Sequence, residues 1–363
     1  MNTLNTHMKN NMASAVHQKG LTMVELLVAL TLSGLIALAA IAALTVARRG
    51  FTTVDSASQL RDNARFASDL VQRIAAQAGY QDLTRANQTR ASEIKVYGSS
   101  VAASGPEPFV KGFNNMVFKP VTGLDAVVRN LTNGGCISGD DASACLNGSD
   151  VLILRYQTQE LYRATGASSP LSDRAMINCK GEAEPLPPTG ADDFTISVFH
   201  VKRSSGGEPA LMCSTGTSTT FGTGNPQPVI QGVESFQVLY GMAYRKGIPT
   251  TRGGTSDTAR YDLPERYLRA DEITTDDQWR QVRSLRIALL LRSPKNANQD
   301  RASQRLQLLG GDNSKDAGSD IWFTDGTPPV NTANFIFPQD GRQRQVVTFT
   351  VYLRNDQDPL KQE

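Results

Sequence analysis

The sequence predicts an α+β protein in which one long N-terminal α-helix packs on an antiparallel β-sheet head with long loops. Three observations predict this fold. Residues 26–47 form a run of 22 residues without a charge, and apolar residues then recur every three or four positions as far as Ala78. Several segments after residue 80 are rich in β-branched and aromatic residues. Long tracts rich in Gly, Pro and Ser separate these segments.

The uncharged run is long enough to cross a membrane. As a helix that rises about 1.5 Å per residue, it spans about 33 Å, which matches the hydrocarbon core of a bilayer. Lys9 and Lys19 precede the run, and Arg48 and Arg49 follow it, so the flanking charges do not decide its orientation. Because a cysteine-bearing remainder is expected to be exported, we place the N-terminus in the cytoplasm. Residues 21–48 are therefore predicted to be the membrane-spanning half of the helix.

A single carboxylate, Glu25, stands near the start of this apolar segment. An ionised carboxylate inside a membrane helix costs about 2.5–3.5 kcal/mol. A plain signal anchor would simply tolerate Glu25, and a secretory signal cut near residues 37–39 would remove it, although the apolar run continues beyond that point. A cut between Gly20 and Leu21 would instead create an α-amine four residues before Glu25. A cation about 4 Å away contributes about 4 kcal/mol at an effective dielectric near 20, which offsets the cost.

Residues 49–79 are predicted to be an amphipathic half of the same helix, packed on the head. Charged residues occupy the faces that the apolar positions leave free. The apolar positions are Phe51, Val54, Ala57, Leu60, Ala64, Ala67, Leu70 or Val71, Ile74 and Ala78. A coiled-coil seam is the alternative, but few heptads and many alanines favour packing on a head. Gly79 is a suitable end, because glycine readily adopts the left-handed conformation that terminates helices.

Residues 80–363 are predicted to form a β-rich globular head. Strand-like segments cover residues 149–158, 193–202, 233–244, 282–293 and 345–355. In the last segment, Val347, Phe349, Val351 and Leu353 share one face. Loops are expected at residues 179–193, 214–228 and 293–320, with a short helix at 301–309. Residues 276–279 are expected to form a helical turn that anchors Trp279 in the core.

Four cysteines lie in the predicted head. None belongs to a C-x-x-C pair, and His200 is the one histidine after the first 20 residues, so the spacing is poor for a zinc site of four ligands. Disulfides are expected in an exported head, and we favour the pairing with the shortest loops. It joins Cys136 to Cys145 and Cys179 to Cys213. Four reduced, partly buried thiols are the alternative.

Charge and motifs argue against a nucleic-acid-binding protein and against an enzyme. Lys9 and Lys19 account for the formal net charge of +2, so the remainder of the chain is balanced. The sequence holds no phosphate-binding glycine loop, zinc-protease motif or serine-hydrolase motif. His200 stands within a strand-like segment and is interpreted as structural. The acidic runs at 139–143 and 271–277 lack the ligand order of a calcium loop. We expect no catalytic residue, metal site or cofactor.

The stretch KGLTMVELLVAL, residues 19–30, resembles the class III leader junction of type IV prepilins and pseudopilins. A leader cation (Lys19), a glycine (Gly20), an apolar first mature residue (Leu21) and Glu25 follow the spacing of that family. The resemblance implies that residues 1–20 are a leader, which prepilin peptidase removes between Gly20 and Leu21, and that Leu21 is N-methylated. It also implies that Glu25 pairs with the terminal amine of an adjacent subunit. Lipid supplies no hydrophobic drive for helix association, so such a pair would set the subunit register.

Three further stretches, residues 64–80, 232–241 and 282–293, are similar to minor pilins of the PilW type. This resemblance implies a type IV pilin-like fold and a minor pilin that joins other minor pilins and the major pilin. Its work would be to prime pilus polymerisation in a tip complex at the inner-membrane assembly platform. The protein would wait in the inner membrane with its head in the periplasm and then enter the filament on a Gram-negative cell surface. A minor pseudopilin of type II secretion and a pilus-tip adhesin or ligand-binding module are the alternatives.

Overall fold

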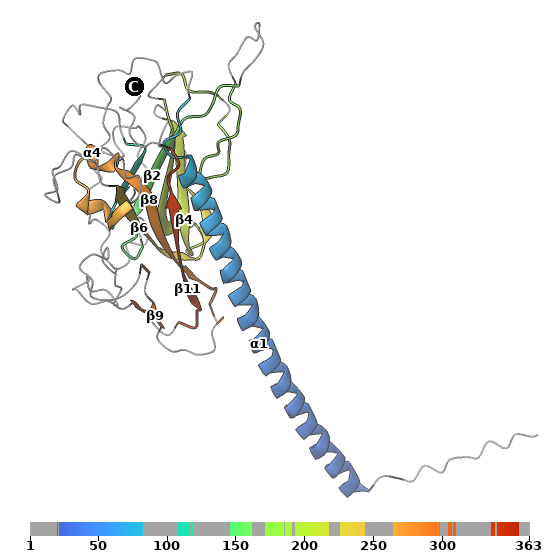
Figure 1. Ribbon diagram of the computed structural model, residues 1–363. Coiled ribbons are helices and arrows are strands. Elements are labelled where there is room, and N and C mark those ends of the chain that lie inside the picture. The colour runs from blue at the N-terminus through green and yellow to red at the C-terminus, as the bar shows by residue number, and fades with distance from the viewer. Residues whose placement is uncertain are drawn as a thin grey trace, which may run out of the picture. The chain divides into compact units, whose positions relative to one another are not determined.

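The computed structural model contains one long helix followed by a β-rich region (Figure 1). The residues that it describes are 20, 22–82, 108–116, 118, 146–161, 171–184, 186–190, 193–217, 226–243, 264–295, 297, 304–306, 308–309, 335–337 and 340–355. The chain divides into two compact units, Met1–Thr52 and Thr53–Glu363. Helix α1 (Met23–Gln77) therefore contributes its first part to one unit and its second part to the other. The α+β class predicted from the sequence is confirmed.

The described part of the first unit is the beginning of α1, and all of it is exposed. Its large apolar side chains include Met23, 84% exposed, and Ile36, 70% exposed. Among the described residues, α1 is the one helix whose length and composition would allow it to cross a membrane. Among the described residues of the head, most large apolar side chains are buried, although Leu161 and Leu186 are exposed.

The second unit contains two antiparallel sheets. One has the strand order β1-β2-β3-β4-β5 and the other the order β11-β8-β6-β7. The first comprises β1 (Val110–Phe113), β2 (Val151–Tyr156), β3 (Thr195–Arg203), β4 (Pro209–Thr217) and β5 (Gln227–Gln231). The second comprises β6 (Val233–Ala243), β7 (Pro264–Leu268), β8 (Val282–Arg292) and β11 (Arg344–Tyr352). Strands β9 (Gln304–Leu306) and β10 (Phe335–Phe337) form a separate pair, and η1 (Ala270–Glu272) and α4 (Asp276–Trp279) follow β7.

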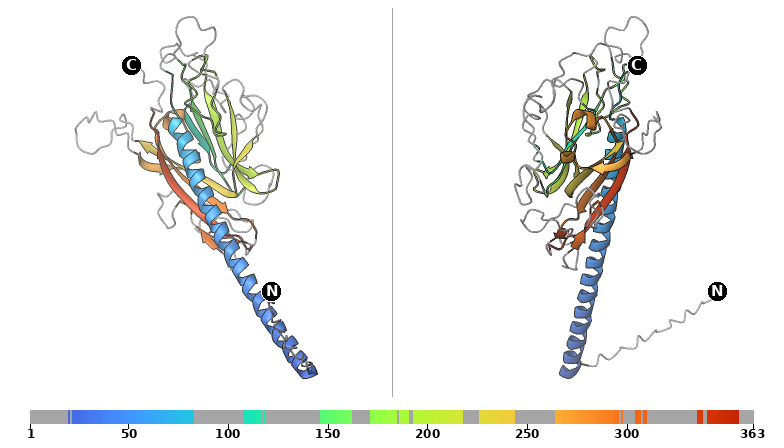
Figure 2. Two further views of the ribbon diagram at one scale, coloured as in Figure 1. Left: turned by 90° about the vertical axis from the view of Figure 1, so that its right-hand side faces the viewer. Right: turned by 60° about the vertical axis from the view of Figure 1, so that its left-hand side comes forward.

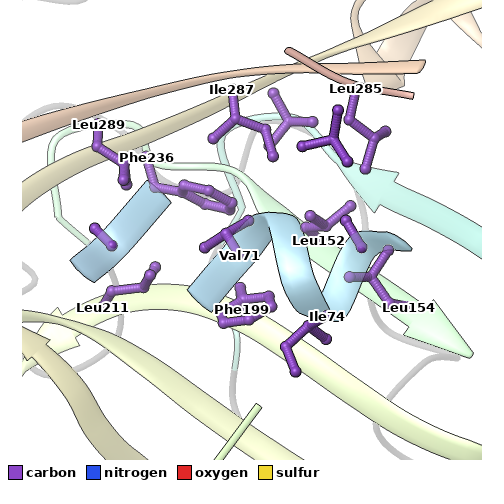
Figure 3. Close-up of a cluster of buried hydrophobic side chains, with 14 of the residues drawn as sticks. Val71, Ile74, Leu152, Leu154, Phe199, Leu211, Phe236, Leu285, Ile287 and Leu289 are labelled. Atoms are coloured by element: carbon purple, nitrogen blue, oxygen red, sulfur yellow. The ribbon is translucent and has the colours of Figure 1, made fainter. Parts of the chain in front are cut away.

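The second part of α1 lies in the core between the two sheets (Figure 3). Its buried residues are Leu60, Ala64, Ala67, Val71, Ile74 and Ala75. Figure 3 shows Val71 and Ile74 among Leu152, Leu154, Phe199 and Leu211 of the first sheet and Phe236, Leu285, Ile287 and Leu289 of the second. The alanines leave room for the sheets to approach the helix closely. In both views of Figure 2, β11 runs beside this part of α1. The helix is thus part of the head's own hydrophobic core.

Gly232 and Asp150 are among the residues that join the two main sheets to each other. Gly232, between β5 and β6, donates its N–H to Pro209 O at 2.7 Å and accepts the N–H of Arg292 at 2.7 Å. Its φ of +80° is a conformation that favours glycine. Asp150, just before β2, accepts the N–H of Val238 in β6 at 2.8 Å. Burial raises the pKa of Asp150 to about 7, although hydrogen bonds from backbone N–H groups favour its ionised form and act in the opposite direction.

Several predictions for the head are confirmed. Strands β2, β3, β6, β8 and β11 lie within or overlap the five segments predicted as strands. In β11 and the residues after it, Val351 and Leu353 are buried, whereas Thr350 and Tyr352 are exposed. Helix α4 forms as expected, and Trp279 packs edge-on against Tyr240 with ring centroids 4.7 Å apart. The continuous burial of β2 follows from its apolar run VLIL, which lies between α1 and the segment after β1.

Other predictions for the head are wrong. At each of these positions, the structure depends on pairing between residues that are distant in the sequence. The helix expected at 301–309 is replaced by β9, because residues 304–306 pair with β10. The loop expected at 214–228 is shorter, since β4 continues to Thr217 opposite Thr195 and β5 begins at Gln227. Two main sheets form where one was expected, because the chain changes sheet at Gly232.

Phe51 and Val54 were predicted to pack on the head, but they are 75% and 67% exposed. Buried helix positions begin at Leu60. Phe51 precedes Leu60 by nine residues, or about 2.5 helical turns, which places the two side chains on opposite sides of the helix. The apolar positions predicted at spacings of three and four residues therefore do not all lie on one face of the helix.

We predict that Gly232→Ala lowers the free energy of unfolding of the full chain by about 3 kcal/mol. The new Cβ would meet a left-handed backbone and would lie 2.7 Å from the carbonyl oxygen of Arg292. Gly181→Ala is the matched control, because Gly181 has φ of +82° but nothing within 4 Å of the added Cβ. It should lose only about 1 kcal/mol. Denaturant unfolding in detergent measures the free energy of unfolding of both variants. Equal losses would contradict the role of Gly232 in joining the two main sheets.

Candidate functional site

The candidate site is α1, beginning with the residues around the predicted cut. Gly20 is exposed, with nothing within 4 Å of the place that a Cβ would occupy. Lys19 and Leu21 lie outside the described residues. Glu25 is in the first turn of the helix. Its predicted intersubunit partner belongs to another chain, so the pairing stays a prediction.

Within the chain, the carboxylate of Glu25 is held by Thr22. Its Oε2 accepts hydrogen bonds from the backbone N–H and from the hydroxyl of Thr22, both at 2.9 Å. In return, the Thr22 hydroxyl accepts the N–H of Glu25 at 3.3 Å. This is a capping box, which satisfies N–H groups that the first helical turn leaves without carbonyl partners. The sequence analysis missed it, although the Thr-x-x-Glu spacing in TMVE was the available signal.

Hydroxyl groups in the first part of α1 are satisfied by the helix itself. Each of the four after Thr22 donates to the carbonyl three residues earlier. The pairs are Thr31 with Val28 (2.9 Å), Ser33 with Leu30 (3.0 Å), Thr45 with Ala42 (2.7 Å) and Thr52 with Arg49 (2.9 Å). A helix in lipid has no water to satisfy its polar groups, so this arrangement suits an apolar surrounding.

The C-terminal end of α1 is tied to the head by polar contacts. Gln77 makes two hydrogen bonds with the backbone of Ile177, donating to its carbonyl at 3.2 Å and accepting its N–H at 2.9 Å. The amide of Asn355, after β11, donates to Ala78 O at 3.0 Å. Gly79 adopts φ of +81° and donates its N–H to Arg155 O at 2.9 Å, which confirms the predicted helix end. These contacts join the helix end to three separate parts of the head.

A disulfide supports the segment that Gln77 contacts. Cys179 and Cys213, one of the two pairs expected from the sequence, are bonded, with Cα atoms 5.7 Å apart. The N–H of Cys179 also donates to Ser197 Oγ in β3 at 3.1 Å. The bond therefore fixes residues next to Ile177 to β4. Cys136 and Cys145, the other expected pair, lie outside the described residues.

A network of ion pairs connects strand ends in the second unit. Its members are Glu208, Glu234, Asp340, Arg292, Arg342 and Arg344. Arg292 bridges Glu208 at 2.7 Å and Glu234 at 2.9 Å. Burial alone would raise the pKa of Asp340, but hydrogen bonding to Arg344 and the charges of Arg344 and Arg342 outweigh it and lower that pKa. The network connects the residue before β4 with β6, β8 and β11, close to Gly232.

No catalytic arrangement emerges in the part of the chain that the structure describes. His200 is buried, with its ring 4.5 Å from that of Phe118 and its Nε2 3.5 Å from Ser214 Oγ. Burial, with a smaller effect of Lys202, lowers the pKa of His200 to about 3, so the ring is neutral.

A cavity of about 590 Å³ lies beside residues 56–63 of α1, with Lys295 on its wall. The described residues contain no group of three or more His, Cys, Asp or Glu side chains that could hold a metal ion.

Two family models match parts of this chain. Residues 16–41 match the prokaryotic N-terminal methylation motif. Residues 198–355 match the family described as Type IV Pilus-assembly protein W. A type IV-like pilin from Thermus thermophilus, TTHA1219, aligns with 82% of this chain and 98% of its own at 13% identity and a TM-score of 0.29. No curated protein matches.

The match to the methylation motif and the long apolar N-terminal helix make the chain similar to type IV pilin-like proteins. The match to Type IV Pilus-assembly protein W covers part of the head, from within β3 to just after β11. The resemblance to the prepilin leader and to the PilW group is thereby confirmed.

We predict that acid weakens the wild-type chain more than a His200→Met variant. The folded-state pKa of His200 is about 3, below the ordinary value of about 6.5, so the unfolded chain binds a proton that the folded chain refuses. The stability of the wild type relative to the variant should therefore fall as pH drops below 6.5, by at most about 1.4 kcal/mol per pH unit until about pH 3.

Urea unfolding at several pH values measures this difference. Asp150 titrates with the opposite sign, because its pKa is raised, but it is present in both chains and cancels. Parallel stability curves between pH 6.5 and 4 would contradict the assignment of His200 as a buried neutral ring.

Proposed function

We propose that this chain is a minor pilin that helps to prime a type IV pilus and remains in its tip complex. The observation that carries the proposal is the division of α1. Its first part exposes a continuous apolar surface, and its second part is core of the head. A helix of this kind can be held first by lipid and then by the stems of neighbouring subunits. The match to Type IV Pilus-assembly protein W favours a pilus over a type II secretion pseudopilus.

The N-terminal residues would prepare the subunit for assembly. Prepilin peptidase would remove residues 1–20 after Gly20, and Leu21 would become the N-methylated first residue. Residues 21–48 would cross the inner membrane, and residues 49–79 would join that span to a periplasmic head formed by residues 80–363. The exposure of Gly20 supports access of the peptidase to the cut.

Glu25 would exchange partners when the subunit enters the filament. In the single chain, two hydrogen bonds from Thr22 reduce the cost of placing its carboxylate in the membrane. In the filament, the cationic terminal amine of an adjacent subunit would replace one or both of those bonds. An ion pair in low dielectric outweighs neutral hydrogen bonds, so the exchange favours assembly and fixes the axial register.

The partners of such a protein would be prepilin peptidase, other minor pilins, the major pilin and the inner-membrane assembly platform. The head would contact the other minor pilins, while the stem would lie among theirs. No nucleic acid, metal or enzymatic role is part of the proposal. The balanced charge after residue 20 supports the exclusion of a broad basic binding surface.

We predict that Glu25→Ala and Glu25→Gln leave membrane insertion intact and reduce incorporation into pili at least tenfold. Both remove the charge that the neighbouring amine requires, whereas Gln keeps a carbonyl oxygen that Thr22 can bond. Thr22→Val is the matched control, because it removes a hydroxyl of the capping box and leaves the carboxylate. Its incorporation should stay within about threefold of wild type.

Quantitative immunoblots of membrane and sheared-pilus fractions measure both steps. Wild-type incorporation of Glu25→Gln would show that the charge is not used. A Thr22→Val defect as large as that of Glu25→Ala would show that the cap, and not an ion pair between subunits, carries the function.

A further inference from the structure

Three exposed side chains mark the end of the apolar part of α1. Leu44, Arg48 and Phe51 follow one another at spacings of four and three residues, so they lie on one face of the helix. Leu44 is 52% exposed and Phe51 is 75% exposed. All three belong to the first unit, Met1–Thr52, and Arg48 is also exposed. An apolar residue, a cation and an aromatic residue thus share one face.

The exposure of Phe51 needs an explanation, because water is a poor environment for a phenylalanine. Removing such a side chain from water is favourable, and the described residues of its own unit do not cover it. The sequence assigned Phe51 to the face that packs on the head, and the structure places it elsewhere. Arg48 and Arg49 lie shortly before it and are the first charges after a span of 22 uncharged residues.

We infer that residues 48–51 form an interfacial anchor that binds anionic phospholipid where α1 leaves the membrane. Phe51 would lie among the upper acyl chains and headgroups, and the guanidinium groups of Arg48 and Arg49 would bind lipid phosphates. This inference rests on the membrane location in the proposed function. It moves the end of the lipid-contacting surface about one helical turn beyond residue 47.

The chemistry of these side chains favours lipid as the occupant. The surface continues directly from the apolar run, which is the part of the chain suited to a bilayer. Arginine extends its apolar stem along hydrocarbon while its head reaches phosphate, and guanidinium binds phosphate oxygens in a bidentate manner. The hydroxyl of Thr52, beside Phe51, donates to the Arg49 carbonyl and so needs no water. Two adjacent cations complement anionic rather than zwitterionic headgroups.

An anchor of this kind would set the depth at which the subunit waits and would have to leave the lipid when the subunit enters a filament. Its strength would therefore depend on the anionic lipid content of the membrane. A juxtamembrane arginine increases the local preference for anionic lipid by about fivefold.

The test uses the full chain in vesicles of phosphatidylcholine and phosphatidylglycerol, with tryptophan probes and brominated lipids as quenchers. The probes are Leu38→Trp, Phe51→Trp and Phe66→Trp, and the wild-type signal of its two tryptophans is subtracted. Leu38 and Phe66 are 68% and 56% exposed, so all three positions tolerate the change. Deeply brominated chains should quench position 38, shallow ones position 51, and neither position 66.

The lipid partner is tested by placing the bromines on one lipid at a time, at equal mole fractions. Brominated phosphatidylglycerol should quench position 51 severalfold more than brominated phosphatidylcholine. The excess should disappear when Arg48→Gln and Arg49→Gln are combined with Phe51→Trp.

The outcomes separate this inference from the proposed function. Quenching at position 38 without quenching at position 51 would overturn the anchor and leave the membrane span in place. Absence of quenching at position 38 would overturn the membrane location itself. Equal quenching of position 51 by the two brominated lipids, or an excess that survives the arginine substitutions, would overturn the anionic partner.

Discussion

The burial of the second part of α1 between two sheets is the interaction on which the rest of the structure depends. Val71 and Ile74 belong to one hydrophobic cluster with side chains of both sheets, so the helix is part of the core that the sheets share. Gln77, Asn355 and Gly79 add polar contacts at the helix end. Helix α1 therefore continues directly into the core of the head.

The first part of α1 meets a different requirement. In the proposed function, it must be stable in lipid without a partner and must still recognise partners later. Back-bonded hydroxyls and the capping box meet the first need, because they leave few polar groups that require water. Glu25 meets the second, because a carboxylate held by neutral donors gains when a cation replaces them. One residue can thus serve both the waiting subunit and the assembled one.

The features that could be predicted from the sequence are those that neighbouring residues determine. Neighbouring residues determine helix α1 and its end at Gly79. They also determine the spacing around Gly20 and Glu25, which resembles that of type IV prepilins. The strands with strong apolar runs, such as β2 and β8, were equally visible. The Thr-x-x-Glu spacing that indicates the Thr22 capping box was also present, but the sequence analysis did not use it.

What could not be predicted depends on residues far apart in the chain. Strand β9 forms only because residues 335–337 pair with it. Gly232 gave no local sign that it joins two sheets, since its partners are Pro209 and Arg292. The contacts of Asn355 with the end of α1 span more than 270 residues, and no spacing rule reaches so far. The face of Phe51 was misassigned because three successive spacings of three residues separate it from Leu60, and each falls about 60° short of a full helical turn.

In the proposed function, one mature chain keeps the apolar helix attached to the head and begins with a charged amine near Glu25. Intact mass and N-terminal fragmentation of the chain purified from membranes test this claim most directly. We expect a polypeptide that starts at Leu21 and carries a methyl group on its α-amine. A chain that retains Met1, or one that begins downstream of residue 39, would contradict it.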